Sequence, residues 1–166
     1  MNKVLLFSIL LVLLLAVGTT VQGQKIEKWK LTDLERAIKT ADKPTIFNFW
    51  ATFCKPCIAE IPYFQQLAKR YDSAGVRLVL VSLDTRADYP KTIAAMAAKR
   101  KFTAPIVYLD ETNADLFCPV VDKAWSGVIP ATLLVNNRTG YRMFFEESLK
   151  EQQLEREIKA MLGHNY

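Results

Sequence analysis

Two apolar runs constrain the fold of this chain more than any other feature. Residues 45–50 are Thr-Ile-Phe-Asn-Phe-Trp, and residues 76–83 form a second, mainly aliphatic run. Runs without polar alternation are typical of parallel strands that helices cover on both faces. Between the two runs, apolar residues recur at helical spacing: Ile58, Ile61, Phe64, Leu67, Ala68 and Tyr71. The pattern predicts a strand, a helix and a second, parallel strand.

The rest of the chain continues this alternation. Helical spacing is found at residues 34–41, 93–97 and 154–162, and strand patterns at residues 105–109, 131–135 and 141–145. Capping boxes at Thr32–Glu35 and Ser148–Glu151 are expected to open the first and last of these helices. The last two strands are joined by Asn-Asn-Arg-Thr-Gly, which favours a hairpin turn. We therefore predict the α/β class with a mixed sheet.

The N-terminal segment has the composition of a targeting signal. Lys3 precedes an almost purely aliphatic run at residues 4–17, and small residues follow up to Gly23. This order predicts a secretory signal peptide at residues 1–23, cleaved before Gln24, and a domain at residues 24–166. Residues 4–21 also reach the lower limit for spanning a bilayer, so an uncleaved membrane anchor stays open. In both cases the domain is expected outside the cytosol, in the periplasm, secreted or membrane-anchored.

Composition excludes several classes of protein. With 51% hydrophobic and 23% charged residues, the 166-residue chain has a globular composition rather than a disordered one. The net charge of +5 is dispersed, and the longest basic run is Lys99-Arg100-Lys101, so we expect no nucleic-acid partner. Three cysteines are too few for a disulfide-stapled scaffold.

The sequence Cys54-Lys55-Pro56-Cys57 lies between the predicted strand 45–50 and the helix that follows it. A thiolate at Cys54 would be stabilised by the helix N-terminus and by the charge of Lys55, and Pro56 suits a first helical turn. A purely structural disulfide would constrain the unfolded chain little. A zinc site would need Cys118 and His164, whose spacing does not match one. The pair is therefore predicted to be redox-active, with no metal and no cofactor besides its own disulfide.

The segments at residues 49–62 and 128–132 resemble the TlpA/ResA-like extracytoplasmic thiol–disulfide oxidoreductases of the thioredoxin superfamily. The resemblance covers nearly all of the chain after residue 23. It implies a thioredoxin-like fold, with a central mixed β-sheet flanked by helices, and thiol–disulfide oxidoreductase activity. The chain departs from the family at Phe53, where Trp usually precedes the first cysteine; Phe keeps the apolar surface and lacks the indole N–H.

The resemblance also implies roles for individual residues. Glu60 matches an acidic residue beside the cysteines, where it can accept the proton of Cys57 or raise both thiol pKa values. The alternative is a solvated carboxylate on a helix surface. Asn48 stands where thioredoxins carry a buried Asp, which leaves proton transfer to Glu60 or water.

Pro130 matches the family's cis-proline, whose loop faces the cysteines and can pair with an extended client strand. The residues expected to form the client-docking rim are Phe53, Lys55, Pro56, Ile129 and Pro130. Trp125 and Tyr108 are expected in the core, with a place in the client groove as the alternative, and Cys118 is expected as a buried free thiol.

The function implied is the reduction of disulfides in client proteins by the Cys54–Cys57 dithiol. A membrane carrier of the DsbD/CcdA type would supply electrons, and the clients would belong to cytochrome c maturation or to general thiol redox homeostasis. An oxidase or isomerase of the same fold, and a non-catalytic peptide-binding module, are the alternatives. A peroxide-reducing activity is a weaker alternative, because the sequence shows no second cysteine motif.

Overall fold

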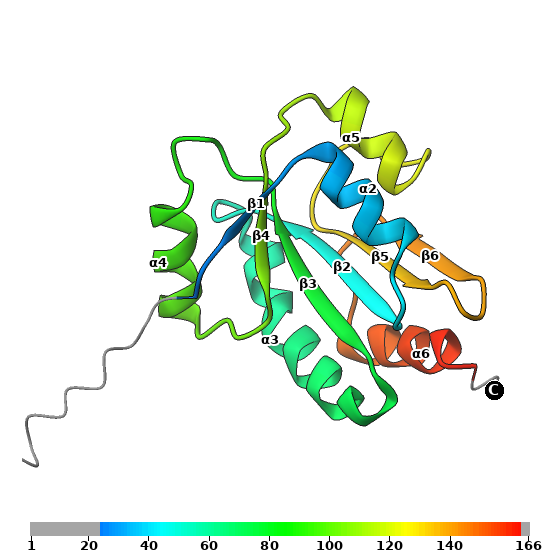
Figure 1. Ribbon diagram of the computed structural model, residues 1–166. Helices are drawn as coiled ribbons and strands as arrows, with labels where there is room; N and C mark the ends of the chain where they lie inside the picture. Colours follow the sequence, from blue (N-terminus) through cyan, green and yellow to red (C-terminus); the bar gives the residue numbers. More distant parts are fainter. Residues whose placement is uncertain (1–23, 164–166) are drawn as a thin grey trace, which may run out of the picture.

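A computed structural model describes residues 24–163, so the predicted signal segment and His164 lie outside the described residues. Six strands in this range form one sheet in the order β1-β4-β3-β2-β5-β6 (Figure 1). The strands are β1 (Glu27–Trp29), β2 (Thr45–Trp50), β3 (Arg77–Ser82), β4 (Ile106–Leu109), β5 (Ala131–Asn136) and β6 (Tyr141–Phe145). The first four in chain order pair in parallel, and β5 and β6 add antiparallel pairs. The predicted α/β class and mixed sheet are confirmed.

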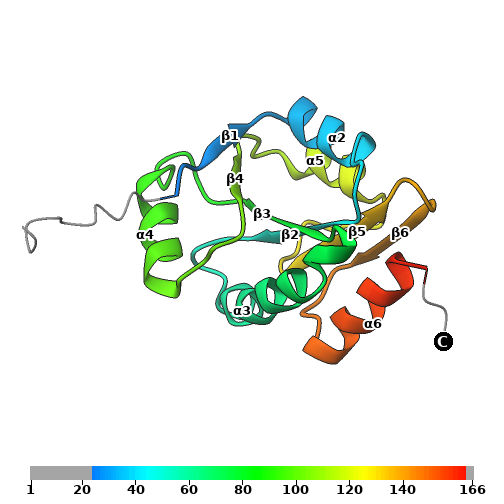
Figure 2. The ribbon, with the colours of Figure 1, turned by 60° about the horizontal axis from the view of Figure 1, so that its bottom comes forward.

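Helices cover both faces of the sheet (Figure 2). The helices α3 (Lys55–Arg70), α4 (Lys91–Arg100) and α6 (Glu151–Met161) bury their apolar residues on one face. The helices α2 (Leu31–Lys39) and α5 (Ala114–Val121) do so on the other. None of the helices within residues 24–163 is long and apolar enough to cross a membrane.

Strand β2 is central, and all six of its residues are buried. Because side chains alternate along a strand, Ile46 and Trp50 pack on the side of α3, while Phe47 and Phe49 pack on the side of α2 and α5. The antiparallel register places Ala131 opposite Phe49. The start of β5 therefore lies beside the end of β2, and this brings the loop before β5 close to the turn that precedes α3.

Two helix starts differ from the prediction. The N-cap of α2 is Lys30, whose backbone N–H donates to Asp33 at 2.9 Å, so the box predicted at Thr32 is wrong. The N-cap of α6 is Lys150, not Ser148. Leu149 is fully buried, so the chain stays extended past Ser148 to place that side chain in the core before the helix begins.

Candidate active site

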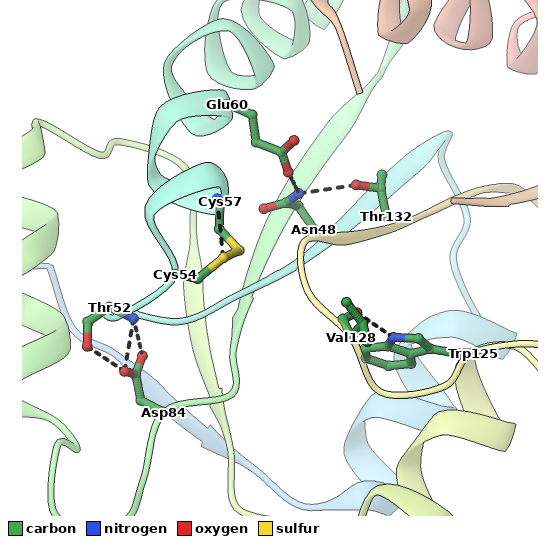
Figure 3. Close-up of a disulfide and its surroundings, with 9 residues drawn as sticks. All are labelled: Asn48, Thr52, Cys54, Cys57, Glu60, Asp84, Trp125, Val128 and Thr132. Atoms are coloured by element: carbon green, nitrogen blue, oxygen red, sulfur yellow. Dashed lines mark hydrogen bonds between the residues drawn. A yellow bond between two sulfur atoms is a disulfide. The ribbon is translucent and has the colours of Figure 1, made fainter. Parts of the chain in front are cut away.

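The two cysteines of the predicted motif form a disulfide at the junction of β2 and α3 (Figure 3). The S–S distance is 2.00 Å, and Cys54 is the N-cap of α3, with its Sγ accepting the Cys57 backbone N–H at 3.3 Å. Cys54 is 7% exposed and Cys57 is 0% exposed. An incoming sulfur can therefore reach Cys54 first, and Cys57 only from within the protein.

Glu60 lies one helical turn beyond Cys57 and is buried, with 1% exposure, so the alternative of a solvated surface carboxylate is wrong. The Asn48 side-chain amide donates to Glu60 Oε1 at 2.8 Å and to Thr132 Oγ1 at 3.1 Å (Figure 3). Burial raises the pKa of Glu60 from 4.5 to about 7, although the hydrogen bond from Asn48 lowers it in part. Near neutral pH this carboxyl group can both take up and release a proton.

The Ile129–Pro130 peptide bond is cis, as predicted, and Pro130 is buried directly before β5. The preceding loop is held from two sides. Glu146, just after β6, accepts the backbone N–H groups of Ser126 and Val128, each at 3.0 Å. The indole N–H of Trp125 donates to the Val128 carbonyl at 2.9 Å (Figure 3). This loop is therefore anchored on the carboxyl-end side of the sheet, where the disulfide lies.

A groove of about 290 Å³ connects the two loops, because Phe53 and Ile129 both line it. Its other lining residues are Leu83, Asp84, Thr85, Glu111, Thr112, Phe117 and Gly127. Phe53 is 69% exposed, so a large apolar side chain borders the groove. Lys55 and Pro56 are also exposed, at the start of α3, but they do not line the groove. The structure thus brings two of the five predicted rim residues together in one depression.

The sequence interpretation missed Asp84, which lies two residues after the end of β3. This carboxylate is 3% exposed and accepts the backbone N–H of Thr52 at 3.0 Å and its hydroxyl at 2.6 Å (Figure 3). It also accepts the Ser82 hydroxyl at 2.7 Å. An available signal was an acidic residue at the carboxyl end of a buried parallel strand, where ligands of α/β sheets bind.

Three further residues singled out in the sequence are buried, and Trp125 among them also holds the loop before Pro130. Trp125 and Tyr108 are buried in the core, as predicted, and Trp125 packs against Phe49 with ring centroids 4.7 Å apart. Cys118 is a buried free cysteine in α5, and burial raises the pKa of its thiol. It packs in the apolar cluster between the sheet and the helices α2 and α5, so it behaves as a core residue.

A disulfide at a strand–helix junction, a cis-proline loop and a mixed sheet between two helical layers define a thiol–disulfide oxidoreductase of the thioredoxin superfamily. The chain belongs to the AhpC/TSA family, whose model matches residues 15–140. Among curated proteins it is similar to the thiol-disulfide oxidoreductase ResA of Geobacillus kaustophilus. That match is 28% identical and covers 93% of this chain and 92% of the relative.

A further relative and two solved structures are also similar to this chain. ResA of Oceanobacillus iheyensis is 49% identical over 55 residues, which are 33% of this chain and 26% of that protein. StoA from Bacillus subtilis, 27% identical, has a TM-score of 0.54 and covers 70% of this chain and 82% of its own. A thioredoxin-related protein from Neisseria meningitidis, 23% identical, has a TM-score of 0.62 over 88% of this chain and 93% of its own. The thioredoxin-like fold predicted from the sequence is confirmed.

Proposed function

We propose that this chain is an extracytoplasmic reductase of protein disulfides, with Cys54 as the attacking and Cys57 as the resolving cysteine. The observation that carries this proposal is the asymmetry of the pair. Cys54, at the N-terminus of α3, keeps 7% of its surface exposed, whereas Cys57 is fully buried one turn before a carboxyl group with a pKa of about 7. A two-step exchange requires an attacking sulfur that clients can reach before the resolving sulfur, and the residual exposure of Cys54 provides this order.

In the first step the Cys54 thiolate attacks one sulfur of a client disulfide. A Cys54–client bond forms, the client S–S bond breaks, and one client thiolate leaves. The N-terminus of α3 and the adjacent Lys55 stabilise the attacking thiolate. Phe53 and Ile129 contact the client through the groove that they share. The main-chain groups of Val128 are already bonded to Glu146 and Trp125. Ile129 lines the groove directly before the cis-proline, and its backbone pairs with an extended client strand.

In the second step Cys57 loses its proton to the Glu60 carboxylate and attacks Cys54 Sγ. The Cys54–client bond breaks, the Cys54–Cys57 disulfide forms, and the second client thiolate leaves. The client thiolates take up two protons, one from Glu60 and one from water. Two electrons pass from the dithiol to the client, and no separate cofactor is needed. Asn48 keeps the Glu60 carboxylate in place through the step.

Each turnover consumes the dithiol, so a two-electron donor must restore it. We assign this role to a membrane carrier of the DsbD/CcdA type, because the predicted signal at residues 1–23 takes the domain out of the reducing cytosol. Clients of cytochrome c maturation and general thiol redox homeostasis both fit this scheme.

Substitution of each cysteine tests the proposal. Wild-type protein is expected to accelerate the reduction of insulin by dithiothreitol, and Cys54→Ser to return the rate to the uncatalysed background. Cys57→Ala keeps the first step and lacks the second, so it is expected to accumulate Cys54–client disulfides that gel electrophoresis without reductant detects. Cys118→Ser is the matched control and should keep the wild-type rate, since Cys118 is buried in α5.

Wild-type activity in Cys54→Ser would contradict the assignment of the attacking cysteine. A reduction potential as high as that of dedicated oxidants, measured against glutathione, would favour an oxidase instead. Peptide binding by a wild-type protein that does not accelerate insulin reduction would favour the binding module.

A further inference from the structure

Asp84 is a buried carboxylate for which the two-step exchange has no use. Its oxygens accept hydrogen bonds from the Thr52 backbone at 3.0 and 3.2 Å, the Thr52 hydroxyl at 2.6 Å and the Ser82 hydroxyl at 2.7 Å. A buried carboxylate needs hydrogen-bond donors, and two residues supply them to Asp84. Burying this charge is costly, and four hydrogen bonds are directed at it, three of them from a single residue.

That residue is Thr52, two positions before Cys54. The same turn is tied at two other places. The Leu83 backbone N–H donates to the Trp50 carbonyl at 2.8 Å, and the Cys54 backbone N–H donates to the Ala51 carbonyl at 3.0 Å. Asp84 thus completes a set of bonds that holds the chain between β2 and α3 to the end of β3. With Thr52 fixed, Phe53 projects toward solvent and Cys54 starts the helix.

We propose that Asp84 is the positioning residue of the attacking cysteine. It fixes the turn that presents Cys54 and Phe53 to clients, and its fixed negative charge disfavours the Cys54 thiolate, which makes the dithiol a stronger reductant. This inference rests on the proposed function and extends it by assigning a second carboxylate to the pair. Glu60 and Asp84 lie on different sides of the disulfide (Figure 3). One serves the resolving cysteine and the other the attacking cysteine.

The direction of the effect follows from the charges near Cys54. On α3, Lys55 favours the thiolate, and Glu60 in its ionised form opposes it. After β3, Asp84 opposes it, as does Glu111 after β4, which lines the same groove as Asp84 and Phe53. Reduction of the disulfide creates the thiolate, so a nearby negative charge stabilises the oxidised form and lowers the reduction potential. Loss of the Asp84 charge is therefore expected to raise that potential.

The test compares Asp84→Asn with Asp88→Asn. Asp88 is a matched control, because its carboxylate also accepts a threonine hydroxyl, that of Thr85 at 2.6 Å, but it does not contact the turn before Cys54. Each full-length protein is equilibrated with glutathione buffers, and its reduced fraction is measured by thiol alkylation. For Asp84→Asn we expect about a tenfold shift of the equilibrium constant toward the dithiol, equivalent to one unit of thiol pKa. The thiolate absorbance of Cys54 should also appear at lower pH.

The positioning role is tested separately at Thr52, where Thr52→Val removes the hydroxyl and keeps the shape. We expect kcat/KM for insulin to fall about tenfold in Thr52→Val, as one charge-assisted hydrogen bond is lost. Thr52→Ser keeps the hydroxyl, so its kcat/KM should equal that of the wild type. An Asp84→Asn protein that is folded and has the wild-type potential would overturn the electrostatic role. Equal kcat/KM in wild type, Thr52→Val and Thr52→Ser would overturn the positioning role.

The equilibrium with glutathione does not depend on client turnover. If the wild-type protein fails to reduce insulin, the proposed function fails, while the potentials of the two Asp→Asn variants still decide the role of Asp84.

Discussion

Glu60 combines a proton-transfer role with a buried location, and the two make its substitution informative. Glu60→Gln keeps the side-chain length and an oxygen that can accept from Asn48, but it cannot take the proton of Cys57. General acid–base catalysis by one side chain typically raises a reaction rate 10²- to 10⁴-fold. We therefore expect the second exchange step to slow by about 10²-fold, with little change in the first step. Rapid-quench measurements of the Cys54–client disulfide would show it accumulating in Glu60→Gln.

The pH profile separates this role from simple packing. In the wild type, the rate of the second step should rise as pH increases through the Glu60 pKa of about 7, since only the carboxylate accepts the proton. Glu60→Gln should lack this inflection. Glu147→Gln, at an exposed position, serves as the control and should keep the wild-type profile. An unchanged inflection in Glu60→Gln would show that another group takes the proton.

The loop before β5 presents Ile129, and it is held by a carboxylate from a different element. Hydrogen bonds from Ser126 lower the pKa of Glu146, which therefore stays ionised at neutral pH. Glu146→Ala removes the acceptor for the backbone N–H groups of Ser126 and Val128. We expect KM for client disulfides to rise about tenfold, as a loop that has lost these bonds must be ordered on binding.

The Cys54–Cys57 reduction potential should stay the same in Glu146→Ala, because this carboxylate contacts the loop and not the cysteines. Steady-state kinetics on insulin and equilibration with glutathione provide the two measurements. A shifted potential with an unchanged KM would refute the assignment of Glu146 to client docking.

Secondary structure could be predicted wherever apolar patterning alone determines it. Strands β2 to β6 and helices α2, α3, α4 and α6 follow runs or spacings in the sequence. Strand β1 does not, because two of its three residues are exposed and it forms by pairing with the edge of β4. Helix α5 was missed because Pro119 lies inside it and interrupts the helical signal.

In the site, too, the residues that could be predicted are those whose relation is fixed by local sequence. Cys54, Cys57 and Glu60 lie within seven consecutive residues, so a single helix fixes their relation and the sequence shows it. Asp84 is 32 residues from Thr52, and Glu146 is 20 residues from Ser126. Only the sheet register brings these pairs together, and polar residues in loops have no periodicity that would identify them. The parts of the site that hold the loops therefore required the structure.

The pH dependence of the whole molecule's stability reflects the burial of Glu60. Its folded-state pKa, about 7, lies above the unfolded value of 4.5, so its protonated form is favoured by folding. Its contribution to stability is fully present below pH 4.5 and is lost as the pH rises toward 7. Each unit between the two pKa values corresponds to ~1.4 kcal/mol, which gives a loss on the order of 3 kcal/mol.

Carboxylates with lowered pKa values change the stability of the protein in the acid range. Asp110, beside Lys30 and Arg86, and Glu155, beside Arg70 and Tyr71, are examples. Their contributions are present above the unfolded pKa values and are lost as the pH falls through the folded ones. Oxidised wild-type protein is therefore expected to be most stable near pH 4.5–5, below the range common for folded proteins.

Urea unfolding of the oxidised wild type and Glu60→Gln at pH 4.5 and pH 8 measures this effect. Because Gln does not ionise, the variant should gain on the order of 3 kcal/mol relative to the wild type between these two pH values. Glu155→Gln is the matched control, since loss of a carboxylate with a lowered pKa changes the pH dependence only in the acid range. If the stability difference between Glu60→Gln and wild type is constant from pH 4.5 to pH 8, Glu60 has the same pKa in the folded and the unfolded protein and carries no proton near neutral pH. It then could not exchange protons with Cys57 near neutral pH, so this stability measurement also tests the second step of the mechanism.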